Sequence, residues 1–326
     1  MLHTRICDLL GIEHPIISAP MAGTATAELA AAVSNAGGFG MIGSRGQPDP
    51  EWLREQIYTT RELTDRPFGV GFISSAPRME RAVEVAIEEK VAAISHSFAD
   101  VTPYVSAAQA AGIKVLAQVQ TVALAESAAL AGVDVITAQG TEAGGHTGHN
   151  GTLPLVAAVI DIAGGIPVLA SGGIGDGRGL AAVLMLGAEG AWIGTRFVAS
   201  LEWGGPDWVR QKVTEASIDD TLLTRVYDLA GAAPFPPEIG HRVLRNDFTD
   251  TWHGRDQEII ARRQELQDQI DAAGRAGDTR IASVNAGGAT GLIDRVEPAG
   301  DIVRRIVAET EAILRSRPGQ VLGGKD

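Results

Sequence analysis

Short runs of apolar residues alternate, over the first 200 positions, with longer segments in which apolar and polar residues recur at helical spacing. The apolar runs lack the every-second-residue alternation of a half-exposed strand, so they predict parallel strands buried on both faces. Gly37, Gly112, Gly132 and Gly187 follow four of the helical segments, where a glycine commonly ends a helix. The predicted strands are residues 14–18, 39–42, 68–72, 92–95, 114–118, 133–138, 167–170 and 191–193, and the predicted helices are 26–36, 50–63, 78–89, 101–111, 121–131, 153–162 and 177–186.

Eight strands with helices between them predict an α/β fold, a (β/α)8 TIM barrel, and an open doubly wound sheet is the alternative. The alternation stops near residue 200, where tryptophan- and proline-rich breaks begin. We therefore expect a barrel over residues 1–200, a smaller helical cap over 201–295, and a C-terminal helix within 296–326 that returns to the barrel.

The composition narrows the class of protein. The 326 residues include 40 Asp and Glu against 27 Lys and Arg, and the net charge of −13 argues against nucleic acid and anionic membranes as partners. The N-terminal segment lacks the apolar run of a secretion signal, and the longest uncharged stretch that resembles a span, residues 179–188, is far shorter than the roughly 20 residues that cross a bilayer. We expect a cytoplasmic protein, and the sequence is compatible with a homo-oligomer.

Two loops carry the sharpest chemical signal. In a barrel of this kind, functional groups lie on the loops that follow the strands' C-terminal ends. Ser171-Gly172-Gly173 follows the seventh predicted strand and Gly194-Thr195 follows the eighth. Exposed N–H groups at helix starts favour a phosphate, glycine lets the backbone approach it, and the hydroxyls add donors. The alternative is that these glycines only make tight turns. Arg196 either pairs with the phosphate or forms an ion pair inside the barrel wall.

A second glycine pattern, residues 38–43 (GFGMIG), matches the G-x-G-x-x-G fingerprint of dinucleotide-binding proteins. That fingerprint must follow a strand and open a helix. Here it follows a predicted helix and overlaps a predicted strand, so we do not assign it a ligand.

The loop after the sixth predicted strand holds the candidate catalytic residue. His146 is flanked by glycine on its N-terminal side, which leaves the imidazole free to face the barrel mouth, and a histidine suits proton transfer near neutral pH. His149 is better explained as a structural residue. Glu142 and both histidines are potential metal ligands, but we expect no metal because no other histidine or aspartate cluster completes a site.

Two rival chemistries lack their residues. Lys114 begins a strand and Lys90 precedes one, so neither lies at the catalytic end for Schiff-base formation. The one cysteine, Cys7, precedes the first strand, which argues against a cysteine nucleophile, a disulfide framework and a cysteine-based zinc site.

Several motifs together resemble the nitronate monooxygenases, formerly called 2-nitropropane dioxygenases. The similarity runs from residue 5 to about 200 and resumes at 283–293. No single motif is specific, but the combination is. The motifs are PIISAPMAG at 15–23, AVSNAGGFG at 32–40, QGTEAGGHTG at 139–148, ASGGI at 170–174, IGTRF at 193–197 and NAGGATGL at 285–292.

The resemblance implies a barrel that binds FMN without a metal, with the flavin phosphate at Ser171, Gly172, Gly173, Gly194 and Thr195. Family members oxidise alkyl nitronates with O2, and the residue matching His146 exchanges a proton or hydrogen bond with the substrate. The other implied cofactor contacts are main chain at Ala19, Pro20, Met21, Ala22 and Gly23, hydrogen bonds from Gln118 and Gln139, and the loop residues Ala143, Gly144 and Gly145.

One position departs from the family pattern: many relatives carry asparagine on the third strand where this chain has Gly71. A hydrogen bond to the flavin is then lost or replaced by water, which leaves the subtype open. The leading hypothesis is nitronate oxidation. The alternatives are an FMN-dependent NAD(P)H oxidoreductase of the quinone reductase or enoyl-acyl-carrier-protein reductase type, and a non-catalytic barrel that binds FMN or phosphate.

Overall fold

The computed structural model describes residues 2–47 and 49–323. Eight parallel strands form a nearly closed barrel in the order β1-β9-β8-β6-β5-β4-β3-β2, which confirms the predicted fold. A parallel bridge between Ile17 and Phe39 joins the first strand to the second, so the sheet closes on itself and the open-sheet alternative is wrong. The barrel strands are β1 (Ile16–Ser18), β2 (Gly40–Gly43), β3 (Phe68–Ile73), β4 (Ala93–Ser97), β5 (Lys114–Val119), β6 (Val135–Gln139), β8 (Val168–Ser171) and β9 (Gly190–Ile193).

Seven helices between these strands match the predicted segments closely. Gly37, Gly112, Gly132 and Gly187 all have positive φ, between 79° and 108°, so each supplies the left-handed residue that a side chain would disfavour after a helix. The helices are α2 (Ala27–Asn35), α3 (Pro50–Leu63), α4 (Glu80–Glu88), α5 (Thr102–Ala110), α6 (Val122–Ala131), α7 (Thr152–Ile162) and α8 (Gly177–Leu186).

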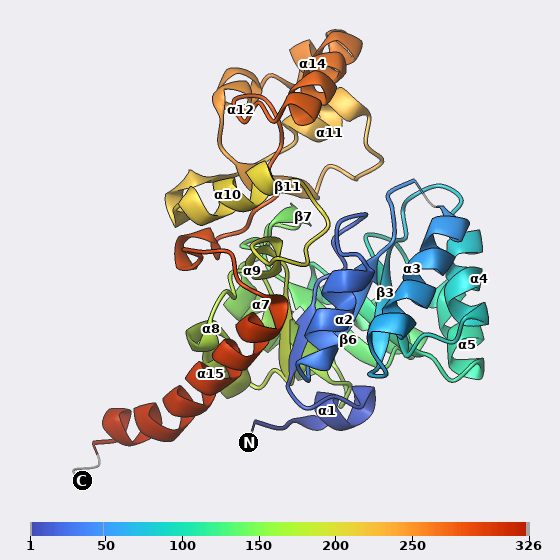
Figure 1. Cartoon of the computed structure of the whole chain (residues 1–326), viewed down its shortest axis with the longest axis vertical. Helices are drawn as coiled ribbons and strands as arrows, with labels where there is room; N and C mark the ends of the chain where they lie inside the picture. The colour runs from blue at the N-terminus through green and yellow to red at the C-terminus, as the bar shows by residue number, and fades with distance from the viewer. Residues whose placement is uncertain (1, 48, 324–326) are drawn as a thin grey trace.

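The barrel has a filled interior. Every second residue of a strand points inward, so Ile17, Met41, Leu116 and Leu169 pack together at its centre. A short helix that the pattern did not indicate, α1 (Arg5–Leu10), adds Ile6, Cys7 and Leu10 to this cluster and covers the N-terminal end of the barrel (Figure 1). The open end of the interior is therefore the opposite one, where the strands finish.

The eighth outer helix comes from the C-terminus. After β9 the chain makes only a four-residue helix, α9 (Thr195–Val198), and the place beside α8 and α2 is filled by α15 (Ala299–Val321), drawn in red in Figure 1. Its residues Ile302, Val303 and Ile306 are fully buried against the barrel.

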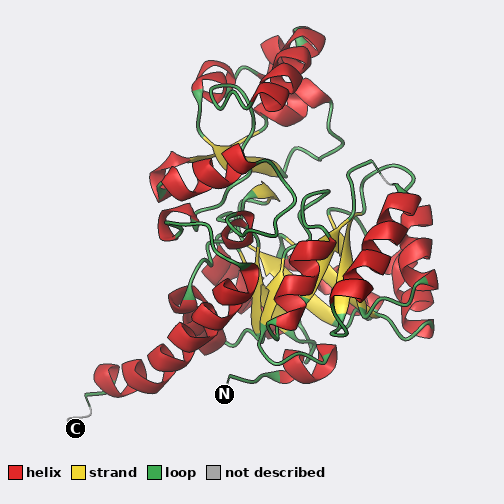
Figure 2. Ribbon diagram, in the orientation of Figure 1, coloured by secondary structure: helices red, strands yellow, loops and turns green. Residues whose placement is uncertain are grey.

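The cap, residues 201–295, lies over the C-terminal ends of the barrel strands (Figures 1 and 2). It contains helices together with two strands that the sequence did not predict. These strands and a third from the loop after β6 form an antiparallel sheet in the order β10-β11-β7, which joins the cap to the barrel. The elements are β7 (Gly145–Thr147), α10 (Asp207–Glu215), β10 (Thr221–Thr224), α11 (Val226–Gly231), β11 (Gly240–Leu244), α12 (Asp247–Trp252), α13 (Asp256–Ala261), α14 (Arg263–Ala276) and two 3-10 turns, Ile218–Asp220 and Thr290–Leu292.

No helix among the residues that the structure describes is both long enough and apolar enough to pass through a lipid bilayer.

Candidate active site

A cavity of about 810 Å³ opens at the C-terminal end of the barrel beneath the cap. This volume lies in the range of roughly 300–1,000 Å³ that is typical of ligand sites. The strands' alternation explains its floor: Leu116 and Leu169 belong to the barrel interior, and Gln118 and Ser171 follow two residues later on the same face. Of the residues singled out from the sequence, the cavity is lined by Ala19, Pro20, Met21, Ala22, Gln118, Gln139, Ala143, Gly144, Gly145, His146, Ser171, Gly172, Gly173, Gly194 and Thr195.

Gly23 is the exception among the sequence candidates. It does not line the cavity, and its N–H donates to the carbonyl oxygen of Gly43 at 3.0 Å. Its positive φ of 69° makes it the turning residue that ends the loop after β1, so its role in the structure is to shape that loop.

The loops after β8 and β9 offer a group of unpaired backbone donors. The N–H groups of Gly172, Gly173 and Gly194 have no hydrogen-bond partner among the described residues. Gly172 and Gly173 have φ of 109° and 74°, a conformation that side chains rarely adopt. Thr195 opens α9, where the first N–H groups of any helix lack an internal partner. Unpaired donors of this kind suit an anionic group such as a phosphate.

The loop after β6 is held against the C-terminal glycine segment. A Cβ on Gly144 would lie 2.6 Å from the backbone nitrogen of Gly287, so only glycine allows these two segments to approach this closely. Gly287 in turn donates its N–H to Thr195 Oγ1 at 3.0 Å. The segments at 139–148 and 285–292 therefore form one wall of the cavity, although they lie far apart in sequence.

The two glutamines differ in their surroundings. Gln118 makes no side-chain hydrogen bond within the described part of the chain, so its amide is available to a ligand. Gln139 accepts from Gln120 Nε2 at 2.9 Å and donates to the carbonyl oxygen of His146 at 3.1 Å. Gln139 therefore already supports the backbone that carries His146, whatever else it contacts.

Gly71 also has a structural reason in this chain. It lines the cavity from β3, and a Cβ at this position would lie 2.2 Å from Cγ of Pro20. The proline ring therefore occupies the space that an asparagine side chain would need. The glycine that stands here in place of the family's asparagine therefore allows Pro20, in the loop after β1, to pack closely against β3.

His146 lies on β7 and lines the cavity. Its Nε2 is 2.8 Å from Oδ1 of Asp228, and its Nδ1 has no partner among the described residues. The ring is stacked between Phe235, with centroids 3.5 Å apart, and His241, with centroids 4.4 Å apart. Phe98 meets the same ring edge-on at 6.1 Å from a strained backbone with φ of 63°. The imidazole is therefore fixed in plane and orientation.

The sequence did not indicate the two ionisable side chains that the structure places beside His146. Asp228 from α11 and His241 from β11 lie beside it, each only 7% exposed. Burial lowers the pKa of His241 to about 4, helped by the charge of His146, so this ring is neutral near neutral pH. Its Nε2 lies 2.7 Å from Asn285 Oδ1.

Three ligand-type side chains of this kind could be taken for a metal site, since their ligand atoms lie within 4.8 Å of one another. An imidazole binds a metal along a lone pair in its ring plane. The planes of His146 and His241 are stacked and only 14° apart, so their lone pairs run side by side and do not converge on one ion. The arrangement fits hydrogen bonding to Asp228 better than metal coordination.

Sequence reasoning missed Asp228, His241 and Phe235, because these residues come from the cap and meet His146 only in the folded chain. It also missed Phe98, although this residue directly follows β4 at the end of the barrel where functional loops are expected. One signal was present: Asp228 interrupts the apolar run Val226 to Ala230, and a carboxylate in such a run is buried with a partner. His241 carries no comparable signal.

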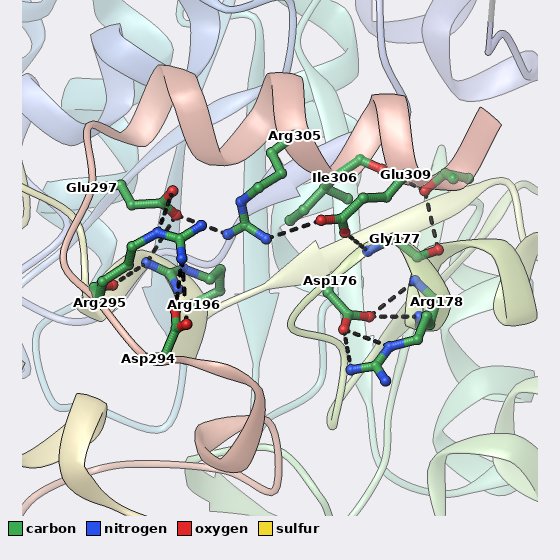
Figure 3. A network of polar contacts seen from close by, with 12 residues as sticks. Asp176, Gly177, Arg178, Arg196, Asp294, Arg295, Glu297, Arg305, Ile306 and Glu309 are labelled. Carbon is green, nitrogen blue, oxygen red and sulfur yellow. Dashed lines mark hydrogen bonds and ion pairs between the residues drawn. The ribbon is translucent and has the colours of Figure 1, made fainter. Parts of the chain in front are cut away.

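Arg196 does not reach the cavity. Its guanidinium is fully buried in the barrel wall, where Nη2 donates to the carbonyl oxygens of Ala199 and Arg295 and lies 3.5 Å from Glu297. Figure 3 shows this network continuing through Arg305 to Glu309 on α15. Burial lowers the pKa of Arg196 to about 10, which still leaves it charged near neutral pH. Of the two roles considered for Arg196, the ion pair in the wall is the one observed.

Comparison with known proteins identifies the class. The profile of the nitronate monooxygenase family matches residues 3–309. This chain therefore belongs to the nitronate monooxygenase family and is an oxidoreductase of that family.

Its relatives carry more than one activity in their names. The solved structure of FabK from Thermotoga maritima is 39% identical, with a TM-score of 0.89 over 98% of this chain and 100% of that one. The (3aS,4S,5R,7aS)-5-hydroxy-7a-methyl-1-oxo-octahydro-1H-indene-4-carboxyl-CoA dehydrogenase of Mycobacterium tuberculosis is 37% identical over 76% of this chain and 68% of its own. A "Probable nitronate monooxygenase" of Staphylococcus saprophyticus is 32% identical over 76% of this chain and 82% of its own.

Proposed function

We propose that the protein is an FMN-dependent oxidoreductase whose flavin phosphate binds the unpaired N–H groups of Gly172, Gly173 and Gly194. The observation that carries this proposal is one cavity that joins these donors to an imidazole, that of His146. An acidic chain needs such local donors to hold an anion, and backbone N–H groups with a helix start supply them. FMN, when bound, supplies one- and two-electron redox chemistry, while the chain binds, orients and moves protons.

For the reaction itself, we propose reduction of an enoyl thioester with NAD(P)H as the electron donor. Two features support this choice over the alternatives. The cavity extends past His146 to Ile270, Asp271, Gly274 and Arg275 on α14, which leaves room beneath the cap for a substrate longer than a small nitronate. The relatives include FabK at 39% identity and a carboxyl-CoA dehydrogenase at 37% identity, and the second name indicates a thioester substrate. His146, with a proton on each ring nitrogen, would deliver the Nδ1 proton to the substrate carbon, and the neutral ring left behind would keep its Nε2 proton toward Asp228.

Oxidation of alkyl nitronates with O2 is the second candidate. It is supported by the family profile and by the relative from Staphylococcus saprophyticus. An anionic nitronate needs a hydrogen-bond donor over the flavin, and a protonated His146 could provide one. The same residue would thus bind a nitro oxygen in one reaction and transfer a proton in the other.

Anaerobic mixing of the purified yellow protein separates the candidates. Rapid bleaching of the flavin by NADH or NADPH, followed by reoxidation with crotonyl-CoA, is the result expected for thioester reduction. Rapid O2 uptake with propionate 3-nitronate and indifference to NAD(P)H would replace that assignment with nitronate oxidation. A protein that keeps its flavin but turns over neither pair of substrates would be a flavin-binding barrel without this chemistry.

The phosphate site has its own test. Gly172→Asp puts a carboxylate among the donors but also strains a backbone with φ of 109°, so Gly194→Asp is the companion variant, since its φ of −108° suits any residue. Both should lose flavin, measured as the ratio of flavin absorbance to protein. Gly46→Asp, at a position with no atom within 4 Å, is the matched control and should keep it. Retention of flavin by a folded Gly194→Asp protein would refute the assignment of the donors.

A further inference from the structure

We infer that Asp228 is a positioning residue, which fixes the proton of His146 on Nε2 and leaves the Nδ1 lone pair as the group that faces the cavity. The inference rests on the proposed proton-transfer role of His146. It also makes the cap part of the chemistry, because Asp228 comes from α11, 82 residues beyond His146.

The contact between His146 and Asp228 is close, and the Asp228 carboxylate makes no other side-chain hydrogen bond within the described part of the chain. Asp228 Oδ1 accepts a hydrogen bond at 2.8 Å from His146 Nε2, and Asp228 Oδ2 has no partner among the described residues. Asp228 is 7% exposed, so water cannot replace its partner as readily as it could at the surface. An ionised carboxylate only accepts hydrogen bonds, so the proton of a neutral His146 must lie on Nε2.

His241 does not compete for this carboxylate. Its Nε2 faces the carbonyl-type oxygen of Asn285 at 2.7 Å, an acceptor, so Nε2 carries the proton of the neutral ring. Its Nδ1 is then a bare lone pair, which agrees with its lack of a partner and with its distance of 3.7 Å from Asp228 Oδ1. The hydrogen-bonding capacity of Asp228 is therefore directed to His146 alone.

Stacking fixes the plane of the ring, and the hydrogen bond to Asp228 selects between its two orientations. In the antiparallel pair of β7 with β11, His146 lies directly opposite His241, and opposite residues of such a pair share one face. Phe235 covers the other face of the imidazole at 3.5 Å between centroids. A half-turn of the ring would move Nε2 away from Asp228 and bring Cε1 toward its place, which leaves the buried carboxylate without its donor. The arrangement has the logic of a histidine held in one tautomer by a carboxylate.

The tautomer can be observed without turnover. Nitrogen-15 NMR of the flavin-loaded protein with labelled histidine, at mildly alkaline pH, distinguishes a protonated from an unprotonated ring nitrogen, and the His146 signals are assigned by their loss in His146→Gln. We expect protonated Nε2 and bare Nδ1. In Asp228→Asn, whose amide can donate as well as accept, we expect the Nδ1–H form to become populated. Asp256→Asn, at an exposed position of the cap, should leave the His146 signals unchanged.

Activity provides the second readout. Asp228→Asn should lower kcat by about 10²–10⁴-fold with little change in KM, since the substrate still binds but meets the wrong nitrogen. A wild-type spectrum with the proton on Nδ1, or an Asp228→Asn protein with unchanged tautomer and kcat, would overturn the inference. If the wild type turns over neither substrate pair, the proposed function fails while the NMR result on the tautomer still stands by itself.

Discussion

At the scale of single residues, the buried polar side chains of this protein separate into those that serve the cavity and those that serve the fold. His146 lines the cavity, whereas His96 is 2% exposed and does not line it. His96 Nδ1 pairs with Ser74 Oγ at 2.7 Å, its Nε2 has no partner, and its ring stacks on Tyr104 with centroids 4.3 Å apart. Burial lowers the pKa of His96 to about 3, so it is neutral in the native state.

His96 should make the fold sensitive to acid. Its pKa rises to the ordinary value of 6.5 when the chain unfolds, so the unfolded state binds the extra proton, and stability falls as pH drops below 6.5 toward 3. Between pH 7 and pH 5 this costs about 2 kcal/mol. His96→Phe, which keeps the stacking, should lose about 2 kcal/mol less over that interval in urea unfolding. The exposed His149→Gln is the control, and equal pH dependence in all three proteins would contradict the prediction.

The sequence indicated those site residues whose residue type is explained by their immediate neighbours along the chain. Gly172 and Gly173 stand out because a glycine pair after a strand, with a helix to follow, has few purposes, and the structure puts both in the cavity wall. Asp228 and His241 could not be found in this way. Their reason is a contact with His146 across 82 and 95 residues of chain, and nothing local to either requires it.

At the scale of elements, the barrel was predictable and the second sheet was not. Buried parallel strands are runs of apolar residues, so β3 and β5 were found within one residue of their bounds. β7 has three residues, one of them Gly145, and is a strand only because β11 pairs with it. Residues 221–224 and 240–244 are too short for periodicity to distinguish strand from loop.

The packing of α15 on α8 gives a prediction at this scale. Gly177 begins α8, and a Cβ there would lie 2.3 Å from Cβ of Glu309, whose Oε2 accepts from the Gly177 N–H at 2.9 Å (Figure 3). Gly177→Ala should therefore push the helices apart and lower the free energy of unfolding by about 1–3 kcal/mol. Gly274→Ala, inside α14 with nothing within 4 Å, should raise it by about 0.5–1 kcal/mol. Unfolding in urea measures both, and a stabilised Gly177→Ala protein would contradict the packing argument.

At the scale of the whole molecule, the cap and the barrel share one site, and the antiparallel sheet is what joins them. Arg242 on β11 strengthens that junction. Its Nε donates to the carbonyl oxygen of Thr141 at 2.6 Å and its Nη2 to Thr141 Oγ1 at 3.3 Å, while Nη1 reaches Thr221 Oγ1 on β10 at 3.2 Å. One guanidinium thus ties both cap strands to the loop that carries His146. Burial lowers the pKa of Arg242, because removing the charged guanidinium from water costs free energy. The hydrogen bonds to Thr141 and Thr221 offset that cost.

Removing that tie should loosen the site without unfolding the barrel. In Arg242→Ala we expect faster hydrogen exchange at β7 and β11, because the strand pairing between the cap and the loop loses its side-chain support. Exchange at β4 and β5 should not change, because the contacts of the barrel stay intact. Mass spectrometry measures the exchange of all four strands. Arg245→Ala is the matched control, since Arg245 follows the same strand but is 55% exposed and pairs with Asp250 at 3.4 Å, an ion pair worth little. Equal exchange in the two variants would mean that backbone pairing alone holds the cap. Faster exchange of the barrel strands as well in Arg242→Ala would mean that cap and barrel unfold as one unit. Only the selective result fits a cap that brings Asp228 to His146 through a sheet anchored by Arg242.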